Sequence, residues 1–397
     1  MVLEVLVLTK DSIDRPSDGG TIRVSNVVRE LRRAGLEPRV LSIRGDVHAQ
    51  LSRMRFRDLM AVIKTGFQFA RWGSLSTIRW FRPRVAAELE RLRGVETLVV
   101  VEFSQLAPYA MAARGLTWHL DMHNVESELL GNYARSVRGP RRVVAQWERW
   151  RVLLLERRSV RAARSVSVVS PIDMSWVRRQ GAGADRCVLL APNGVDEAAF
   201  SVPPGSRGLA VVFVGHLGWA PNVDAADWLT TSVWPIVRES APEARLFLVG
   251  RYPHRRVFEL ENEESGVTVI PNPDDVWPYI QSSRVATAPL LAAGGTRLKI
   301  LEALALGTPV VATSLGALGL EALEGRDLAI CDSPNEFAEA VCLRLREEPS
   351  MDRCRSTVAN YSWPVVLTPM VEQIVRLADV EDTDGGDPKW SERSARS

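Results

Sequence analysis

The sequence predicts an α/β protein built from two doubly wound domains, each with a parallel sheet, and three observations support this fold class. The chain of 397 residues is too long for one hydrophobic core of common size. Short, nearly continuous apolar runs alternate with helical stretches, as expected of strands buried on both faces. A segment rich in Pro, Asn and Gly, residues 191–208, interrupts this alternation once and predicts a connection between the domains.

The first series of strands and helices occupies the N-terminal half of the chain. Apolar runs predict strands at 2–9, 37–43, 96–103, 117–123 and 165–170. Helices are expected over 21–35, closed by Gly35, and over much of the Arg-rich segment 140–164. We expect this N-terminal domain to span residues 1–195.

The second series follows the connection and repeats the pattern. Strands are expected at 209–215, 244–250, 266–271, 284–290, 308–314 and 328–331, and helices at 223–239, 335–347 and 364–378. We expect the C-terminal domain to span 196–362, with a final helix, 363–380, that packs back toward the N-terminal domain. The polar tail 381–397 is expected to be disordered.

The composition is ordinary for a soluble globular protein, with 46% apolar and 25% charged residues. The net charge of +2 conceals an asymmetry, because residues 1–197 carry +11 and residues 198–397 carry −9. The basic excess is concentrated in 51–93 and 135–164, where Arg is interleaved with apolar side chains. These segments are either solvated helical faces or a surface for anionic lipid or a phosphorylated acceptor. No nucleic-acid-binding motif accompanies the charge, so no nucleic-acid partner is expected.

The cysteines and the apolar runs indicate a cellular compartment. Four cysteines without CxxC or metal-ligand spacing predict free thiols and a reducing cytoplasm. The chain opens directly into a strand-like run and has no stretch of 18 apolar residues, so we expect neither a secretory signal nor a membrane span. A cytoplasmic protein is expected, and peripheral contact with the inner face of the membrane is the alternative that the basic segments leave open.

Two glycine-rich turns follow predicted strands, where doubly wound sheets bind ligands. Gly19 and Gly20, in DRPSDGGT, either offer backbone amides to an anion at a helix N-terminus or form only a tight turn. Gly215 and His216, in FVGHLGWAPN, follow the first strand of the second domain. His216 is either a phosphate donor or a surface loop histidine.

A third turn, in GGTRLKILEAL, places charged residues at the start of an apolar helix. Gly294 and Gly295 permit close backbone approach, and Arg297 and Lys299 add positive charge to the helix N-terminus. Lys299 lies three residues before Glu302, which places the two on one helix face. A surface ion pair is one explanation. The apolar residues around Glu302 favour another, because a buried carboxylate needs a partner such as a ligand hydroxyl.

These stretches resemble the retaining glycosyltransferases of family 4, which have the GT-B fold: two facing Rossmann-like domains with a cleft between them. PLLAAGGTRLKILEALALGTPVVATSLGALGLEAL resembles the donor-binding region of that family, and APNGVD resembles its linker motif. SDGGTIRVSNVVRELRRAG resembles its N-terminal glycine loop and helix, and LDMHNVES is similar to the segment that places a histidine in the cleft. The resemblance extends to about residue 378. It implies a metal-independent retaining enzyme that moves a sugar from a nucleoside-diphosphate sugar to an acceptor hydroxyl.

The resemblance also implies roles for individual residues. Glu302 would hydrogen-bond the donor ribose, while Lys299 and Arg297 would neutralise the diphosphate. His123 would contact the donor sugar or the acceptor, with a buried structural histidine as the alternative. The remaining implied donor contacts are backbone contacts from Gly294, Gly295 and Thr296, approach to the diphosphate by Gly19 and Gly20, and base binding around Pro271 and Asn272.

Two departures from the family pattern leave the donor sugar open. Gly294 stands where many members have a second Glu, and His216 stands in a turn where many have Arg and Lys. A nucleotide-sugar-binding protein without turnover and a sugar-nucleotide epimerase are therefore kept as alternatives. A dehydrogenase is disfavoured, because no glycine fingerprint with a downstream acidic residue is present.

The acceptor is not indicated by the sequence. A glycan, a lipid-linked sugar and a natural-product aglycone all fit an acceptor that offers a hydroxyl. Five tryptophans of the N-terminal half are either core anchors or an apolar acceptor wall: Trp72, Trp80, Trp118, Trp147 and Trp150. No clustered pair of Asp residues predicts a metal site, and no cofactor is expected.

Overall fold

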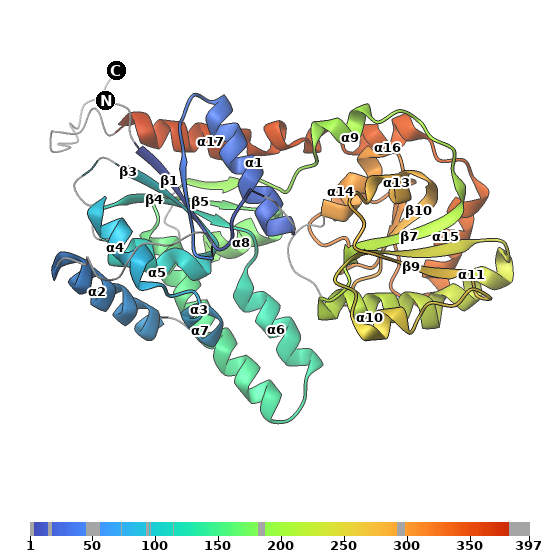
Figure 1. Cartoon of the computed structure of the whole chain (residues 1–397), viewed down its shortest axis with the longest axis horizontal. Coiled ribbons are helices and arrows are strands. Elements are labelled where there is room, and N and C mark those ends of the chain that lie inside the picture. Colours follow the sequence, from blue (N-terminus) through green and yellow to red (C-terminus); the bar gives the residue numbers. More distant parts are fainter. Residues whose placement is uncertain are drawn as a thin grey trace, which may run out of the picture.

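The computed structural model contains two α/β domains, each with a six-stranded parallel sheet between helices (Figure 1). It describes residues 4–14, 18–44, 56–72, 74–92, 95, 97–113, 115–181, 187–291 and 298–380. The predicted fold class is confirmed. The tail 381–397, expected to be disordered, lies outside the described residues.

The N-terminal sheet has the strand order β2-β1-β3-β4-β5-β6, and its central strands are buried on both faces. Its strands are β1 Glu4–Thr9, β2 Arg39–Ser42, β3 Thr97–Glu102, β4 Thr117–Met122, β5 Ser165–Val168 and β6 Cys187–Leu190. Its helices are α1 Gly19–Arg33, α2 Phe56–Trp72, α3 Leu75–Ile78, α4 Pro83–Arg91, α5 Ala107–Ala112, α6 Glu126–Ser136, α7 Pro140–Ala162 and α8 Pro171–Arg179. The short strand β6 is not among the predicted strands.

The C-terminal sheet has the order β12-β11-β10-β7-β8-β9. Its strands are β7 Gly208–His216, β8 Arg245–Arg251, β9 Val267–Pro271, β10 Ser283–Ala288, β11 Val310–Ala312 and β12 Leu328–Ile330. The helices are α9 Glu197–Ser201, α10 Ala220–Trp228, α11 Trp234–Ser240, α12 Arg255–Phe258, α13 Trp277–Gln281, α14 Leu298–Ala305, α15 Pro334–Arg346, α16 Met351–Thr357 and α17 Trp363–Val380.

Three elements differ from the sequence-based expectation. Helix α1 begins at Gly19, two residues early, because Asp18 caps it by accepting a hydrogen bond from the Thr21 amide. The helix expected over 223–239 is divided into α10 and α11 by a π-helical turn at Leu229–Val233. The segment 191–208 is not wholly irregular, since α9 lies within it.

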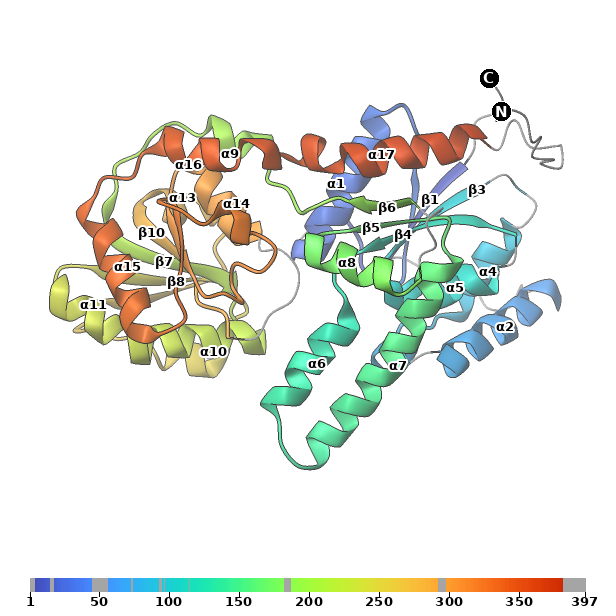
Figure 2. The same ribbon diagram turned by 180° about the vertical axis from the view of Figure 1, so that it is seen from behind.

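The last helix, α17, leaves the C-terminal domain and lies along α1 of the N-terminal domain (Figures 1 and 2). Its apolar side chains complete a core with the inner faces of α1, β1 and β3. Trp363 begins this helix and is buried there. The chain therefore crosses between the domains twice, once before β7 and again at the start of α17.

The two crossings are joined by backbone hydrogen bonds. The amide of Val195 donates to the carbonyl of Tyr361 at 2.8 Å, and the amide of Trp363 donates to the carbonyl of Val195 at 3.2 Å. Gly194 lies against this junction, where an added Cβ would stand 2.9 Å from the backbone nitrogen and Cα of Trp363. A side chain at position 194 would therefore push the crossings apart.

Replacing Gly194 by Ala is expected to lower the free energy of unfolding by about 1–3 kcal/mol, the usual cost of overpacking a closed contact. Thermal unfolding of the full chain measures the effect. Gly325→Ala is the matched control, because a Cβ at that position meets no atom within 4 Å. Equal melting temperatures for the two variants would contradict the tight contact.

Helices α6 and α7 form a hairpin that projects from the body of the N-terminal domain (Figures 1 and 2). The Glu156 carboxylate of α7 holds the start of α6 by accepting from the amides of Glu126 at 2.7 Å and Ser127 at 3.3 Å. Burial raises the pKa of Glu156 to about 8, against the lowering effect of these hydrogen bonds. The hairpin thus starts at a fixed position just beyond β4.

Two further expectations concern free cysteines and membrane-spanning helices. All four cysteines are free, as predicted. Among the described helices, none combines the length and apolar character that crossing a bilayer requires.

Candidate active site

Backbone strain collects at the carboxyl ends of the strands. Three non-glycine residues in the described chain have positive φ: Phe103 at 78°, Tyr252 at 50° and Asn272 at 51°. Each directly follows a strand, namely β3, β8 and β9. Such conformations cost free energy and persist chiefly where a site requires them. The strained residues therefore indicate a ligand-binding site at the carboxyl edge of each sheet, where parallel sheets bind ligands.

A buried charged network occupies this edge of the N-terminal domain. Arg23 of α1 donates to both oxygens of Asp121 at the end of β4, at 2.7 and 2.9 Å. His123 follows β4, and its Nε2 lies 2.7 Å from Oε2 of Glu102 at the end of β3. The same Nε2 lies 3.5 Å from Oδ2 of Asp121. One network thus links the three elements α1, β3 and β4.

The pKa values of this network move in opposite directions. Burial and then the neighbouring Asp121 raise the pKa of Glu102 to about 7. Burial opposes charge on Asp121 as well, but Arg23 holds the pKa of that carboxyl well below its usual range. Burial alone would lower the pKa of His123, and its hydrogen bonds to the two carboxylates raise it. Glu102 and His123 therefore retain protons near neutral pH more readily than they would in water.

Phe103 connects this network to the glycines of α1. Its ring centroid lies 3.9 Å from that of His123, and the ammonium of Lys10 lies 3.8 Å from its centre. A Cβ at Gly20 would stand 3.1 Å from Cζ of Phe103, so only glycine leaves the ring its full space. Burial lowers the pKa of Lys10 to about 8, although Glu126 raises it. This edge therefore has aromatic, cationic and amide groups side by side.

Three residues of the buried network could in principle bind a metal ion. The oxygen and nitrogen atoms that Glu102, Asp121 and His123 would offer to it lie within 4.8 Å of one another. Their donors are poorly suited to a metal ion, because Arg23 and Ser167 already donate to the oxygens of Asp121. A cation would have to compete with that guanidinium. The arrangement is that of an ion-pair network, and independence of metal stays a prediction.

Lys299 lies in the first turn of α14 and extends to the end of β7. Its Nζ is 3.4 Å from Oδ1 of Asn222 and 4.5 Å from the centre of the Phe213 ring. A Cβ at Gly215 would stand 3.2 Å from this Nζ, so the absence of a side chain at 215 leaves room for the ammonium. The structure therefore brings Lys299 and Gly215 together, as an anion site formed by both would require.

Glu302 occupies the next turn of α14 and is half-buried. Its Oε1 accepts a hydrogen bond of 2.6 Å from the indole of Trp277, and burial raises its pKa in spite of that bond. Within the described chain, Trp277 is the one hydrogen-bond partner that the structure records for this carboxylate. The second oxygen, Oε2, can therefore accept a hydrogen bond from a ligand.

The remaining predicted residues of the C-terminal domain flank these two. Pro271 ends β9, and Asn272 accepts from the amide of Tyr252 at 2.8 Å. The segment after Asn272 leads to α13, whose Trp277 holds Glu302. His216 is exposed at the end of β7, with its ring 5.4 Å from that of Tyr252.

The two halves of the site meet at α1 and α14. A Cβ at Gly19 would stand 3.3 Å from Cδ1 of Leu298, the residue before Lys299. Gly19 and Gly20 occupy the first turn of α1, where amides are free of intrahelical bonds. The turn that would complete this region lies outside the described residues: Gly294, Gly295, Thr296 and Arg297.

Two family models match the sequence along these two domains. The model described as a glycosyl transferase 4-like domain matches residues 18–194, and the model described as glycosyl transferases group 1 matches residues 208–347. The matched ranges cover most of the chain: the first contains the N-terminal sheet except β1, and the second contains all six strands of the C-terminal sheet. The chain is a glycosyltransferase of GT-B type.

Solved structures of the same fold cover nearly the whole glycosyltransferase. A sucrose-phosphate synthase from Thermosynechococcus elongatus superimposes with a TM-score of 0.66 at 17% identity, covering 94% of this chain and 99% of that one. The Anabaena protein HepE in complex with UDP gives 0.60 at 14% identity, with coverages of 94% and 100%. At these identities the likeness concerns the fold alone.

A curated relative matches a smaller part of the glycosyltransferase. It is an uncharacterized 44.6 kDa protein in the cps region of Klebsiella pneumoniae, 26% identical over 138 residues. The alignment spans 33% of this chain and 36% of that protein. The relative therefore adds no activity to the assignment.

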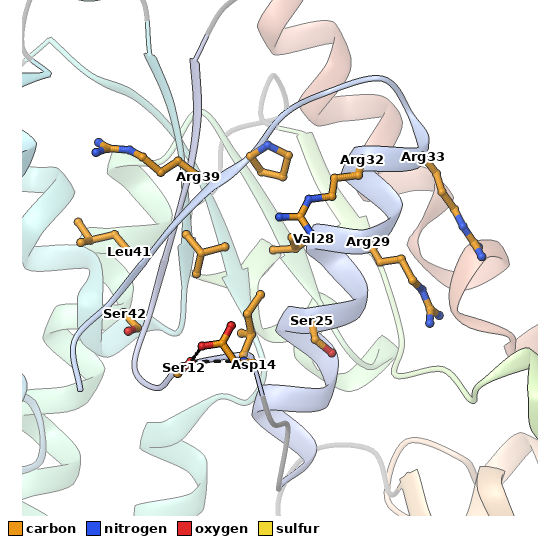
Figure 3. A pocket seen from close by; sticks show the side chains of 13 residues that line it. Ser12, Asp14, Ser25, Val28, Arg29, Arg32, Arg33, Arg39, Leu41 and Ser42 are labelled. Carbon is orange, nitrogen blue, oxygen red and sulfur yellow. Dashed lines mark hydrogen bonds between the residues drawn. The ribbon is translucent and has the colours of Figure 1, made fainter. Parts of the chain in front are cut away.

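A cavity of about 1000 Å³ lies apart from the site, between α1 and the edge strand β2 (Figure 3). Arginines of both elements line it, and several are already paired. Arg39 contacts Glu4 at 3.0 Å and Glu88 at 2.9 Å, and Arg29 lies 3.6 Å from Asp196 beside α9. The cavity contains none of the predicted site residues, and its charges tie α1 to neighbouring segments.

Several site residues of the glycosyltransferase were missed by sequence reasoning: Lys10, Arg23, Glu102, Phe103 and Asp121. A signal for three of them was present. Glu102 ends an apolar run, Asp121 lies inside another, and Arg23 lies among the apolar residues of a helix. A charged residue within a buried strand needs a partner, and that need could have identified all three.

Proposed function

We propose that this glycosyltransferase moves a sugar, with retention of configuration, from a nucleoside-diphosphate sugar to an acceptor hydroxyl. The placement of Lys299 and Glu302 on successive turns of α14 carries the proposal. The two side chains present a cation and a carboxylate oxygen at the edge where Gly19 of the other domain approaches. The HepE complex with UDP supports a nucleotide donor, because that protein shares the fold.

The proposed donor lies across the carboxyl edge of the C-terminal sheet. Lys299 and the amides of Gly19 and Gly20 bind the diphosphate, and Oε2 of Glu302, which bonds to no other residue that the structure describes, accepts from ribose hydroxyls. The segment at Pro271 and Asn272 holds the base. When the sugar leaves, negative charge grows on the diphosphate, and a cation already in place stabilises that charge without reorganisation.

His123 is proposed to orient a hydroxyl of the donor sugar or of the acceptor. Its Nε2 is engaged by Glu102, which leaves Nδ1 as the ring atom for a ligand. Closure of the two domains over the donor would exclude water and limit hydrolysis. A nucleotide-sugar-binding protein without turnover is the second candidate, because Gly294 replaces the carboxylate that many related enzymes have there.

Thermal shift of the purified chain against a panel of nucleoside diphosphates and their sugars tests the donor class. The right donor should raise the melting temperature in proportion to saturation. Lys299→Ala and Glu302→Ala should each weaken that donor about 10–100-fold, the value of a hydrogen bond to a charged group.

Matched controls on the same domain are Arg255→Ala and Glu259→Gln, which alter an exposed ion pair. If the site variants bind donor as tightly as these controls, the assignment is wrong. Release of free sugar or its transfer to an acceptor by the wild type separates an enzyme from a binding protein. EDTA in the same assay tests the predicted independence of metal.

A further inference from the structure

Helix α2 has apolar residues on both of its faces. Its inner face packs on α4 and α5 and buries Ala61 and Phe69. Leu59, Ile63 and Phe67 recur every fourth residue on the other face and are exposed, with Phe67 60% exposed. A helix that only covers a core has polar residues on its outer face, so this outer apolar stripe is available to a partner outside the domain.

The first turns of α7 show the same feature. Trp147 and Trp150 are 47% and 53% exposed, although tryptophan in a monomeric soluble protein is normally well covered. Val143 and Val144 beside them are exposed as well. Tryptophan is the side chain most favoured at the boundary between water and lipid, because its ring is apolar and its N–H is polar.

Helix α7 contacts the end of α2 and the start of α3. Arg151 of α7 donates to the carbonyls of Ala70 and Arg71 at the end of α2, at 3.0 and 2.9 Å. Glu148 accepts from the amides of Leu75 and Ser76 at the start of α3. These contacts fix α7 against α2 and α3, so the exposed apolar residues lie on helices that are held together. We call Leu59, Ile63, Phe67, Leu75, Trp147 and Trp150 the α2–α7 face.

The charge of this surface has one sign. The only acidic residues of α2, α3 and the first turns of α7 are Asp58 and Glu148, and both are buried. Asp58 is paired with Arg91 at 3.2 Å, and Glu148 is held by the two amides of α3. Arginine and lysine occupy the exposed positions around the apolar stripe, at Arg57, Lys64, Arg71, Arg79, Arg141 and Arg142. The outward charge therefore complements an anionic surface.

We propose that the α2–α7 face docks on an anionic membrane surface, with the apolar stripe at the acyl boundary and the basic residues among the headgroups. An amphipathic helix with apolar and cationic residues on its outer side binds in this manner. The projecting α6–α7 hairpin begins three residues after His123 and contributes α7 to the docking face, so that face and His123 are connected through one hairpin (Figure 1). On the proposed function, the acceptor is then a lipid-linked molecule.

Co-sedimentation of the full-length protein with vesicles tests the proposal. Vesicles containing phosphatidylglycerol should retain the protein at low salt, and phosphatidylcholine vesicles or high salt should release it. Ile63→Ser/Phe67→Ser should lower the vesicle partition coefficient at least about tenfold. Lys64→Glu/Arg71→Glu should lower it by a similar factor and remove the salt dependence.

The matched control is Phe258→Ser/Leu343→Ser, which removes two exposed apolar side chains from the C-terminal domain. This variant should bind vesicles as the wild type does. Failure of the wild type to bind, or equal binding by the α2 variants, overturns the proposal. So does a dimer in size-exclusion chromatography that Ile63→Ser/Phe67→Ser dissociates, because a second copy would then cover the face.

Donor binding by thermal shift distinguishes this proposal from the proposed function. Vesicle binding without a donor-induced shift supports the membrane surface and contradicts the proposed nucleoside-diphosphate-sugar donor. A donor-induced shift without vesicle binding supports the proposed donor and contradicts the membrane surface.

Discussion

Replacing Arg23 by Leu is expected to lower the free energy of unfolding by about 3–5 kcal/mol, because it leaves the buried Asp121 carboxylate without its counterion. Both side chains are fully buried and joined by two hydrogen bonds. Arg23 also donates to the carbonyl of Pro192 in the connection between the domains, at 3.1 Å. Thermal unfolding should therefore show a large drop in melting temperature.

The pH dependence of this loss has a definite sign. Asp121 has a lowered pKa in the folded state, so its contribution to stability is present above the unfolded value of about 3.9 and disappears as the pH falls through the folded value. In Arg23→Leu, an acidic medium protonates Asp121 and removes the unpaired charge. The difference between variant and wild type should therefore shrink from neutral pH toward pH 4.

Arg29→Leu on the same helix is the matched control, because that side chain is partly exposed and its buried partner Glu30 keeps an ion pair with Arg33 at 3.0 Å. Its effect should stay within about 0.5 kcal/mol. If Arg23→Leu is no more destabilising than this control, the ion pair between Arg23 and Asp121 contributes little to the free energy of unfolding.

Replacing Glu102 by Gln is expected to slow sugar transfer about 100-fold while leaving donor binding at Lys299 and Glu302 intact. The carboxylate accepts a hydrogen bond from Nε2 of His123 and so determines which ring nitrogen is left for the substrate. Glutamine keeps the shape and can offer an N–H at the same place, which favours the wrong tautomer. The expected signature is a lower kcat with little change in the donor KM.

NMR titration of the His123 ring checks this role without an acceptor. The hydrogen bonds to Asp121 and Glu102 raise the pKa of His123, so Glu102→Gln should lower it, and Glu102→Asp should retain part of the increase. The pKa of Glu102 is itself raised, to about 7. Its contribution to stability is thus complete below the unfolded value of about 4.3 and is lost as the pH rises through 7. Glu102→Gln should abolish that decline.

An unchanged His123 titration in Glu102→Gln, together with an unchanged transfer rate, would show that Glu102 is only a buried structural residue. A fall in rate without a shift in the titration would point instead to a local change of fold. Circular dichroism and the donor-induced thermal shift of Glu102→Gln separate the two explanations. Both should equal those of the wild type if the fold is intact, and either should differ if the fold has changed.

The predicted strands were found because parallel strands buried on both faces leave a strong sequence signal. The runs at 2–9 and 209–215 correspond to β1 and β7, and the runs at 96–103 and 117–123 to β3 and β4. The strand β6 was missed because its apolar run is only four residues long and leads directly into the segment rich in Pro, Asn and Gly. The π-helical turn between α10 and α11 was missed because the segment stays helical throughout and no residue type marks a π-helical turn.

The sequence by itself determined the two-domain α/β architecture and the candidate donor residues Lys299 and Glu302. Periodicity, glycine turns and the charges of GGTRLKILEAL depend on residues that are neighbours in the sequence, so they can be predicted without the tertiary structure. Only the tertiary structure decided that Trp277 holds Glu302, that Arg23 neutralises Asp121 across 98 positions, and that α17 returns to α1. Those contacts join segments far apart in the chain, and burial, which sets their pKa values, exists only once the core has formed.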